Sequence, residues 1–216
     1  MLDIDIINQR GNYMKLKKTA AVFLCALAAL MPVTGCSGKD ESSEEIYYGQ
    51  AYKEVNAKDI YRIYDGRFIT DEEADAVAKY FYSVQTQDYE LFASTQPAPY
   101  LDFLNKQKEG YTQDYLSTFY NDEMEGIGGD FEYTQLEITD CGNKDDDHSL
   151  SDISEMLDGI YQDAGEDKLF SETVKDQKYI KCTLTAIKKG DETSAEFTNA
   201  DQILYVFTCE NGIYIL

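Results

Sequence analysis

Residues 70–94 read TDEEADAVAKYFYSVQTQDYELFAS, and this stretch contains the clearest structural pattern of the sequence. Thr70 precedes Glu73 by three positions, which is the capping-box arrangement, in which each side chain accepts a hydrogen bond from the other residue's backbone amide. Small and apolar residues then recur at helical spacing, namely Ala74, Val77, Ala78 and Phe81. The pattern predicts a helix that ends near Gln87, and Asp88 can cap a short second helix.

More helices and a strand follow along the chain. One helix is predicted after Pro99 and another after Thr112. The second of these carries an apolar stripe formed by Tyr115, Leu116, Phe119 and Tyr120. Residues 131–141, FEYTQLEITDC, alternate in polarity and predict a strand. Ser149 begins another predicted helix, whose apolar face consists of Leu150, Ile153, Leu157, Ile160 and Tyr161.

The C-terminal part of the chain predicts an antiparallel meander. Residues 178–188 and 201–209 have the composition of strands, and the turn ENG at 210–212 leads into a short last strand at 213–216. Helices first, then a strand, a helix and a meander indicate an α+β domain. We expect its helices to pack on one face of a curved antiparallel sheet.

Three segments carry a resemblance to a known fold: the capped helix DEEADAVAKYFYSVQTQ, the helix-to-helix step QDYELFAS and the closing DQILYVFTCENGIYIL. Together they resemble the nuclear transport factor 2-like (cystatin-like) fold, as found in many small bacterial lipoproteins. The resemblance covers roughly residues 68–216 and lies in the pattern of elements rather than in a residue motif. It implies a cone-like domain with a pocket between the helices and the curved sheet.

Residues 1–35 have the pattern of a signal peptide. A cationic segment, residues 14–18 (MKLKK), precedes an apolar run at 19–31 that is too short for a comfortable membrane span. The sequence VTGC at 33–36 resembles the lipobox of bacterial lipoproteins, which are cut before a diacylated cysteine. We therefore expect Cys36 to carry lipid and to tether the protein to the extracytoplasmic face of a membrane. Because acidic residues precede the cationic segment, Met14 is a candidate for the true start.

Residues 36–67 have a polar beginning, SGKDESSEE, followed by a tyrosine-rich stretch without sustained periodicity. We interpret this segment as a flexible tether or an irregular arm, which leaves 68–216 as the domain. The formal net charge of the chain is −22. Charge of this sign repels phosphate backbones, so nucleic acid is not expected as a partner.

Three cysteines remain outside the signal peptide and lipobox, namely Cys141, Cys182 and Cys209. If the strands at 178–188 and 201–209 pair with Leu184 opposite Phe207, then Cys182 lies opposite Cys209 on the same face and a disulfide can form. A slip of two residues keeps the faces matched but separates the two thiols. The sequence pattern leaves both registers open.

The sequence contains no complete catalytic or metal-binding motif. Its single histidine, His148, follows Asp145, Asp146 and Asp147 in a polar loop, which does not provide the shielding that a catalytic dyad needs. Two acidic loops could offer oxygen ligands to calcium, but neither has the spacing of an EF-hand. Their candidate ligands are Asp140, Asn143, Asp145 and Asp147 in one loop and Asp122, Glu123, Glu125 and Asp130 in the other. We expect neither a metal ion nor a cofactor.

These observations favour a membrane-anchored envelope module that is not an enzyme and that binds a small ligand or a neighbouring envelope protein. Two alternatives remain. One is an enzyme of the lyase or isomerase type that uses a carboxylate in the pocket as its general base. The other is a structural role in which the domain forms a homodimer through its sheet. Inward-facing ionisable residues would favour the enzyme, whereas an open sheet face would favour binding or assembly.

Overall fold

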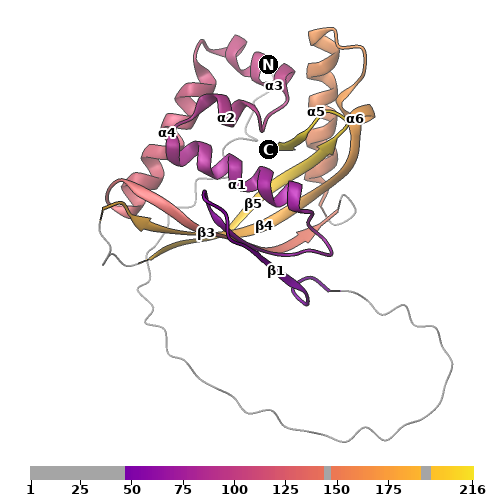
Figure 1. Ribbon diagram of the computed structural model, residues 1–216. Coiled ribbons are helices and arrows are strands. Elements are labelled where there is room, and N and C mark those ends of the chain that lie inside the picture. The colour runs from indigo at the N-terminus through magenta and orange to yellow at the C-terminus, as the bar shows by residue number, and fades with distance from the viewer. Residues whose placement is uncertain (1–46, 144–146, 191–195) are drawn as a thin grey trace, which may run out of the picture. The chain divides into compact units, whose positions relative to one another are not determined.

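The computed structural model describes residues 47–143, 147–190 and 196–216. They form an α+β domain in which helices pack on a six-stranded sheet (Figure 1). The elements in chain order are β1 (Tyr52–Val55), β2 (Tyr61–Asp65), α1 (Asp71–Thr86), α2 (Tyr89–Ala93), α3 (Ala98–Gln107), α4 (Tyr111–Ile127), β3 (Phe131–Gly142), α5 (Ser149–Ala164), α6 (Phe170–Thr173), β4 (Val174–Lys188), β5 (Phe197–Cys209) and β6 (Ile213–Ile215).

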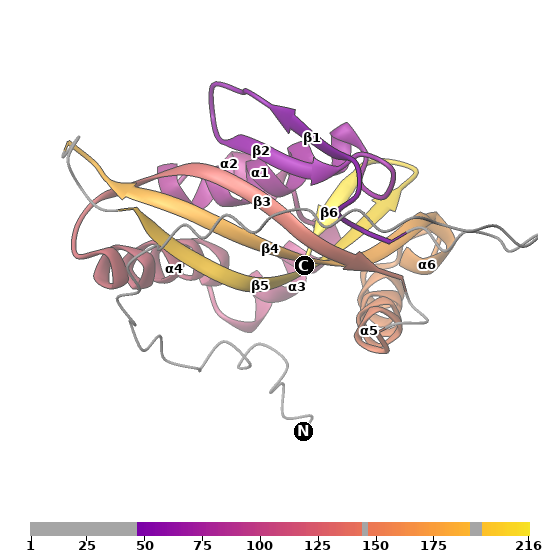
Figure 2. The same cartoon turned by 90° about the horizontal axis from the view of Figure 1, so that it is seen from below.

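The strands lie side by side in the order β1-β2-β3-β4-β5-β6 (Figure 2). Strands β2 and β3 run parallel, and all other neighbouring strands run antiparallel. The predicted fold class is confirmed as α+β, with N-terminal helices on a largely antiparallel sheet. The sheet is open and mixed, because one strand joins it in the parallel direction.

Helix α1 begins as its sequence predicts. The Thr70 hydroxyl accepts from the Glu73 amide at 3.2 Å, and the Glu73 carboxylate accepts from the Thr70 amide at 2.9 Å. The helix ends at Gln87, which has a left-handed backbone with φ of 52°. Asp88 then caps α2, where its carboxylate accepts from the Leu91 amide at 3.0 Å. These two local predictions are confirmed.

Hydrophobic residues form one core on each face of the sheet. Val206 belongs to the core under α1 and α4, whereas the next residue, Phe207, belongs to the core beneath α5. In the same way, Ile215 belongs to the core under α1 and α4, and its neighbour Tyr214 belongs to the core beneath α5. Because successive side chains of a strand point to opposite faces, the two helical groups must lie on opposite sides of the sheet. In Figure 1, β4 and β5 accordingly rise between α1 and α4 on one side and α5 on the other, and α3 also contacts α5.

Aromatic rings fill the space between the N-terminal helices and the sheet. Tyr80 of α1 contacts Phe81, Phe92 and Phe119, with ring centroids 5.3, 5.8 and 6.4 Å away. Phe81 then contacts Tyr133 of β3 at 6.0 Å. The implied pocket between helices and sheet is therefore occupied by the protein's own side chains. The grooves described below lie outside this region.

The segment expected to be a tether or an irregular arm contains the first two strands. The interpretation of 36–67 as a tether is wrong for the residues of β1 and β2, which belong to the sheet. Two physical reasons explain the error. Both strands are short, and β2 is placed by parallel pairing with β3, as in Arg62 opposite Leu136, more than 70 residues later in the chain. No local pattern in the sequence reports such a contact.

The buried carboxylate of Asp65 holds this hairpin together. It accepts hydrogen bonds from the backbone amides of Gly49, Gln50 and Ala51 at 3.0, 3.1 and 3.2 Å. The guanidinium of Arg67 binds both of its oxygens, at 3.0 and 2.6 Å. Arg67 and, to a smaller extent, the Ala51 amide hold the pKa of Asp65 well below its usual range, against the opposing effect of burial.

The register of β4 and β5 differs from both registers that the sequence allows. Cys182 lies opposite Gln202, and Cys209 lies opposite Val174, so the two cysteines are far apart along the ladder. Cys141, Cys182 and Cys209 form no disulfide within the described residues, so the suggested bond between Cys182 and Cys209 is not present. The physical reason is that β4 is longer than expected and begins at Val174, which pairs with Cys209, so that the ladder from Asp176 to Cys182 runs opposite Thr208 to Gln202.

Glu73 does more than cap α1, because its buried carboxylate also binds the sheet. The Lys178 ammonium of β4 approaches it to 3.1 Å, and the Thr208 hydroxyl of β5 donates to it at 3.0 Å. The same ammonium donates to the Phe68 carbonyl at 3.0 Å. Burial would lower the pKa of Lys178, but the carboxylates of Asp176 and Glu73 outweigh it, and the pKa is raised. The charge of Lys178 is therefore retained inside the structure.

We expect Glu73→Ala to lower the free energy of unfolding by about 3 to 5 kcal/mol, because it leaves the Lys178 ammonium without its buried partner. Urea denaturation followed by circular dichroism measures the change. Glu72→Ala, at the exposed neighbouring position of the same helical turn, should cost less than about 1 kcal/mol. Equal losses in the two variants would contradict the role given to Glu73.

Asp65 should make the free energy of unfolding depend on pH in the acidic range. Its pKa is lower in the folded than in the unfolded chain, so its contribution is present above the unfolded pKa of about 4 and is lost as the pH falls below it. Asp65→Asn should therefore destabilise the protein at pH 7 by about 2 to 4 kcal/mol. In urea titrations, the difference in free energy of unfolding between Asp65→Asn and the wild type should become smaller as the pH falls from 4 to 2. A difference that stays constant over this range would exclude the predicted linkage.

Candidate functional site

A groove of about 470 Å³ lies between the start of β4 and helix α5. We call it the β4–α5 groove. It is open to solvent and is lined by residues from three elements (α5, α6 and β4) and one loop, namely Asn143, Ser154, Ser171, Val174, Lys175, Asp176 and Gln177. The groove exists because β3 ends its pairing at Gly142, opposite Tyr179, so the first residues of β4 have no neighbouring strand on that side.

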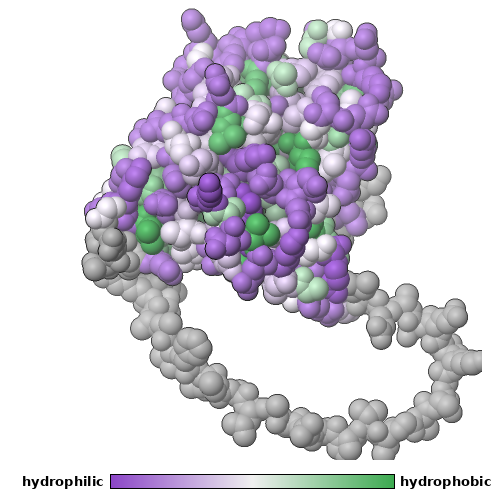
Figure 3. Space-filling view, viewed as in Figure 1, coloured by the Kyte–Doolittle hydropathy of each residue, from purple (hydrophilic) through white to green (hydrophobic). Residues whose placement is uncertain are grey.

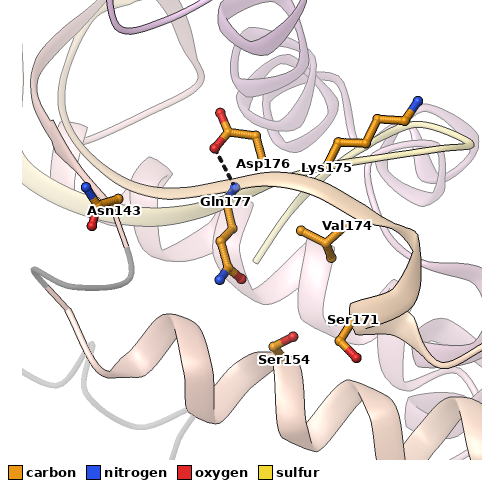
Figure 4. Close-up of a pocket in the computed structure, with 7 residues that line it drawn as sticks. All are labelled: Asn143, Ser154, Ser171, Val174, Lys175, Asp176 and Gln177. Carbon is orange, nitrogen blue, oxygen red and sulfur yellow. Dashed lines mark hydrogen bonds between the residues drawn. The ribbon is translucent and has the colours of Figure 1, made fainter.

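The side chains that point into the groove are uncharged. Figure 4 shows Ser154, Val174 and Gln177 directed toward the space between β4 and α5, whereas Asp176 and Lys175 are directed away from it. The register shift between Val174 and Asp176 explains this arrangement, because it brings Val174 to the same face of the strand as Gln177. The charge of Asp176 is used on the other face, where its carboxylate lies 3.0 Å from the Lys178 ammonium.

Hydrogen bonds hold the floor of the groove in place. The backbone amide and the hydroxyl of Ser171 both donate to the carboxylate of Asp158 at 2.7 Å. Asp158 belongs to α5, so these bonds connect the two sides of the groove. Hydroxyl and amide groups, such as those of Ser154 and Gln177, can both donate and accept hydrogen bonds. The arrangement can therefore bind polar groups that carry no net charge.

A smaller hollow of about 250 Å³ lies between the β1–β2 hairpin and the start of α1. We call it the hairpin notch, and it is lined by Val55, Arg62, Tyr64, Asp71, Glu72 and Asp75. The Arg62 side chain is only 7% exposed and pairs with Asp59 at 2.5 Å and with Asp75 at 3.2 Å. Asp71 receives hydrogen bonds from the Lys53 ammonium and the Tyr64 hydroxyl, and both bonds lower its pKa.

The candidate residues from the sequence are not brought together into one site. His148 is exposed and is not part of the lining of either hollow. Cys36, the expected lipid attachment site, lies outside the described residues, as do Asp145 and Asp146. The structure therefore leaves the lipid anchor as a prediction.

The two acidic loops use their carboxylates for other contacts. Asp140 lies 3.3 Å from the Lys181 ammonium, and Asp147 accepts from the Ser149 amide at 2.8 Å, a bond that lowers the pKa of Asp147. The second expected loop is in fact the last turns of α4, which contain Glu123, and the residue before β3, Asp130. Asp130 accepts from the Tyr120 hydroxyl at 2.7 Å, and Glu123 accepts from Asn199. Within the described residues, no three His, Cys, Asp or Glu side chains are grouped so that they could hold a metal ion.

The surface seen in Figure 3 is mostly hydrophilic, and its hydrophobic residues form small separate patches. The described part of the chain contains no helix that is both long and apolar enough to cross a membrane. No protein-family model matches the chain, and comparisons with curated proteins and with solved structures also give no match.

The sequence analysis did not identify the β4–α5 groove. Its inward-facing residues, such as Ser154 and Gln177, are ordinary polar residues without motif spacing. The only local feature that bears on the groove was the apolar face of α5. This face must pack on a surface, and Ser154 then lies beside that surface. The position of the groove depends on where β3 ends and where β4 begins, and neither was predicted to the residue.

Proposed function

We propose that this protein is a bacterial lipoprotein, anchored through Cys36 to the extracytoplasmic face of a membrane, whose domain binds an uncharged polar ligand in the β4–α5 groove. The binding is not coupled to catalysis. The observation that carries the proposal is the lining of this groove, in which hydroxyl and amide groups point inward and charged groups point away.

The size and the chemistry of the groove support this proposal. Its volume of about 470 Å³ falls within the range that small-molecule sites usually have. Its openness and polar lining suit a ligand that exposes many hydroxyl or amide groups, such as a saccharide or a peptide backbone, rather than an apolar molecule. We propose further that the domain belongs to the nuclear transport factor 2-like fold. The α1–α2 step and the closing β4–β5–β6 meander support this assignment.

The location of the charged groups favours binding over catalysis. A lyase- or isomerase-like reaction needs a carboxylate that faces the substrate and is shielded from water. In the β4–α5 groove, Asp176 faces away and is paired with Lys178, while Asp158 accepts the hydroxyl of Ser171. Ser171 would need a base to become a nucleophile, and the single histidine of the chain does not line this groove.

The ligand site can be tested by placing a photoreactive diazirine amino acid, close to leucine in size, at position 154 of the full chain in its native envelope. After irradiation, we expect a defined mass adduct on the purified protein. The control is the same group at Gln162, an exposed position on α5 about 12 Å further along the helix axis. An absence of adduct at position 154, or the same adducts at both positions, would contradict binding in the groove.

The anchor makes a separate prediction. In cells fed an alkyne analogue of palmitate, the wild type should become labelled because only a cysteine thiol at the lipobox position accepts the lipid. Cys36→Ala should remove the label completely, whereas Cys141→Ala should retain it. Labelling that survives in Cys36→Ala would exclude the proposed attachment site, whatever the result for the groove.

A further inference from the structure

Strand β1 forms an open edge of the sheet. It pairs only with β2, through four consecutive residue pairs without a bulge. The opposite edge differs, because the Ile215 amide of β6 donates to the Thr95 carbonyl at 2.9 Å and the Ile215 carbonyl accepts from Gln96 at 2.6 Å. The backbone of β6 is thus covered on its outer side. On the outer side of β1, by contrast, no strand of the described residues pairs with the backbone.

The charged side chains of β1 disfavour a second copy of β1 at this edge, but they do not keep away a strand of different composition. Folded proteins usually keep other strands away from an edge with charges or bulges. Here the Lys53 ammonium is held by Asp71 at 2.5 Å, and the Glu54 carboxylate is held by the Tyr61 hydroxyl at 2.5 Å. Both groups therefore turn toward their own domain. Two large side chains beside the edge remain exposed, Tyr47 at 59% and Tyr52 at 50%.

A second copy of this chain is a poor occupant of the edge. Two residues that lie opposite each other in a sheet must point to the same face. Two antiparallel copies of β1 are related by a two-fold axis, and they meet this condition only if the axis passes through a residue position and not between two residues. The two registers that pair most of β1 centre on Lys53 or on Glu54. Each of them places like charges directly opposite each other, which is unfavourable.

The hairpin notch indicates the chemistry of a different occupant. Val55 of β1 lines this notch, so alternate side chains of a strand added at β1 would point toward it. Three carboxylates, those of Asp71, Glu72 and Asp75, line the notch with the guanidinium of Arg62. Asp71 and Asp75 are ion-paired, but Glu72 has no ion-pair partner among the described residues. Its negative charge is available to a cation that arrives from outside.

We infer that β1 binds an extended segment of another protein, which adds to the sheet as a strand and places a basic side chain in the hairpin notch. Backbone hydrogen bonds to β1 supply the affinity of such strand addition, and the side chains supply the specificity. The overall charge of −22 attracts a basic segment over a longer distance. This surface is separate from the β4–α5 groove, and the inference does not depend on the function proposed for that groove.

The probe for this inference is a fluorescein-labelled octapeptide in which valine alternates with lysine, titrated against the full chain in detergent and followed by fluorescence anisotropy. We expect saturable binding that is weakened about three- to tenfold by Glu72→Lys. Glu90→Lys is the matched control, because it makes the same charge change at an exposed position in the first turn of α2. Ser154→Arg, which fills the β4–α5 groove, should leave the affinity for this peptide unchanged.

Two further peptides separate strand addition from simple charge attraction. An octapeptide with the same residues but with every amide N-methylated keeps its charge and cannot donate backbone hydrogen bonds, so its binding should be lost. An octapeptide with glutamate in place of lysine should not bind. Equal affinity of the N-methylated peptide, or equal effects of Glu72→Lys and Glu90→Lys, would overturn the inference. A dimer of the chain that the lysine peptide dissociates would also overturn it, because the edge would then belong to a second copy.

Discussion

The buried carboxylate of Glu73 connects helix α1 to strands β4 and β5 of the sheet. It completes the cap of α1, holds the ammonium of Lys178 on β4 and accepts the hydroxyl of Thr208 on β5. These contacts fix the start of the helix against two neighbouring strands. They also decide which way β4 faces, because Lys178 and its partner Asp176 must lie on the side of α1. Gln177, between them, is thereby directed to the other side, into the β4–α5 groove.

The two cores of the sheet give its two faces different roles. On the face of α1, rings such as Tyr80 and Phe81 occupy the interior, so that this part of the domain serves stability. On the other face, α5 covers the end of the sheet around Phe207 but leaves a gap beside the start of β4. The β4–α5 groove therefore lies where α5 no longer covers the sheet, and not between the helices and the sheet in the interior of the domain.

Local signals predicted the helices well, because their information lies within a few residues. Thr70 and Glu73 are three positions apart, and Asp88 lies directly before the helix that it caps. The strands were predicted in kind but not in register. The pairing of Cys182 with Gln202 depends on where β4 begins, and at bulges such as the one at Asp201 a single inserted residue exchanges the faces of all residues beyond it. For the same reason, the sequence could not reveal whether Cys182 and Cys209 meet, or that Val174 and Gln177 share one side of the groove. The β1–β2 hairpin was missed because its anchors are distant in sequence, such as the pairing of Arg62 with Leu136.

The hydrogen bonds that Asp65 accepts from Gly49, Gln50 and Ala51 also fix the place where the chain enters the domain. If Cys36 is the point of lipid attachment, only 13 steps along the chain separate the lipid from Gly49 (49 − 36 = 13). A fully extended chain of this length spans at most about 45 Å, which is close to the thickness of one bilayer with its headgroups. Only a short segment of chain would then join the lipid to the hairpin. Whatever the domain binds must come to the membrane surface, because the domain cannot travel far from it.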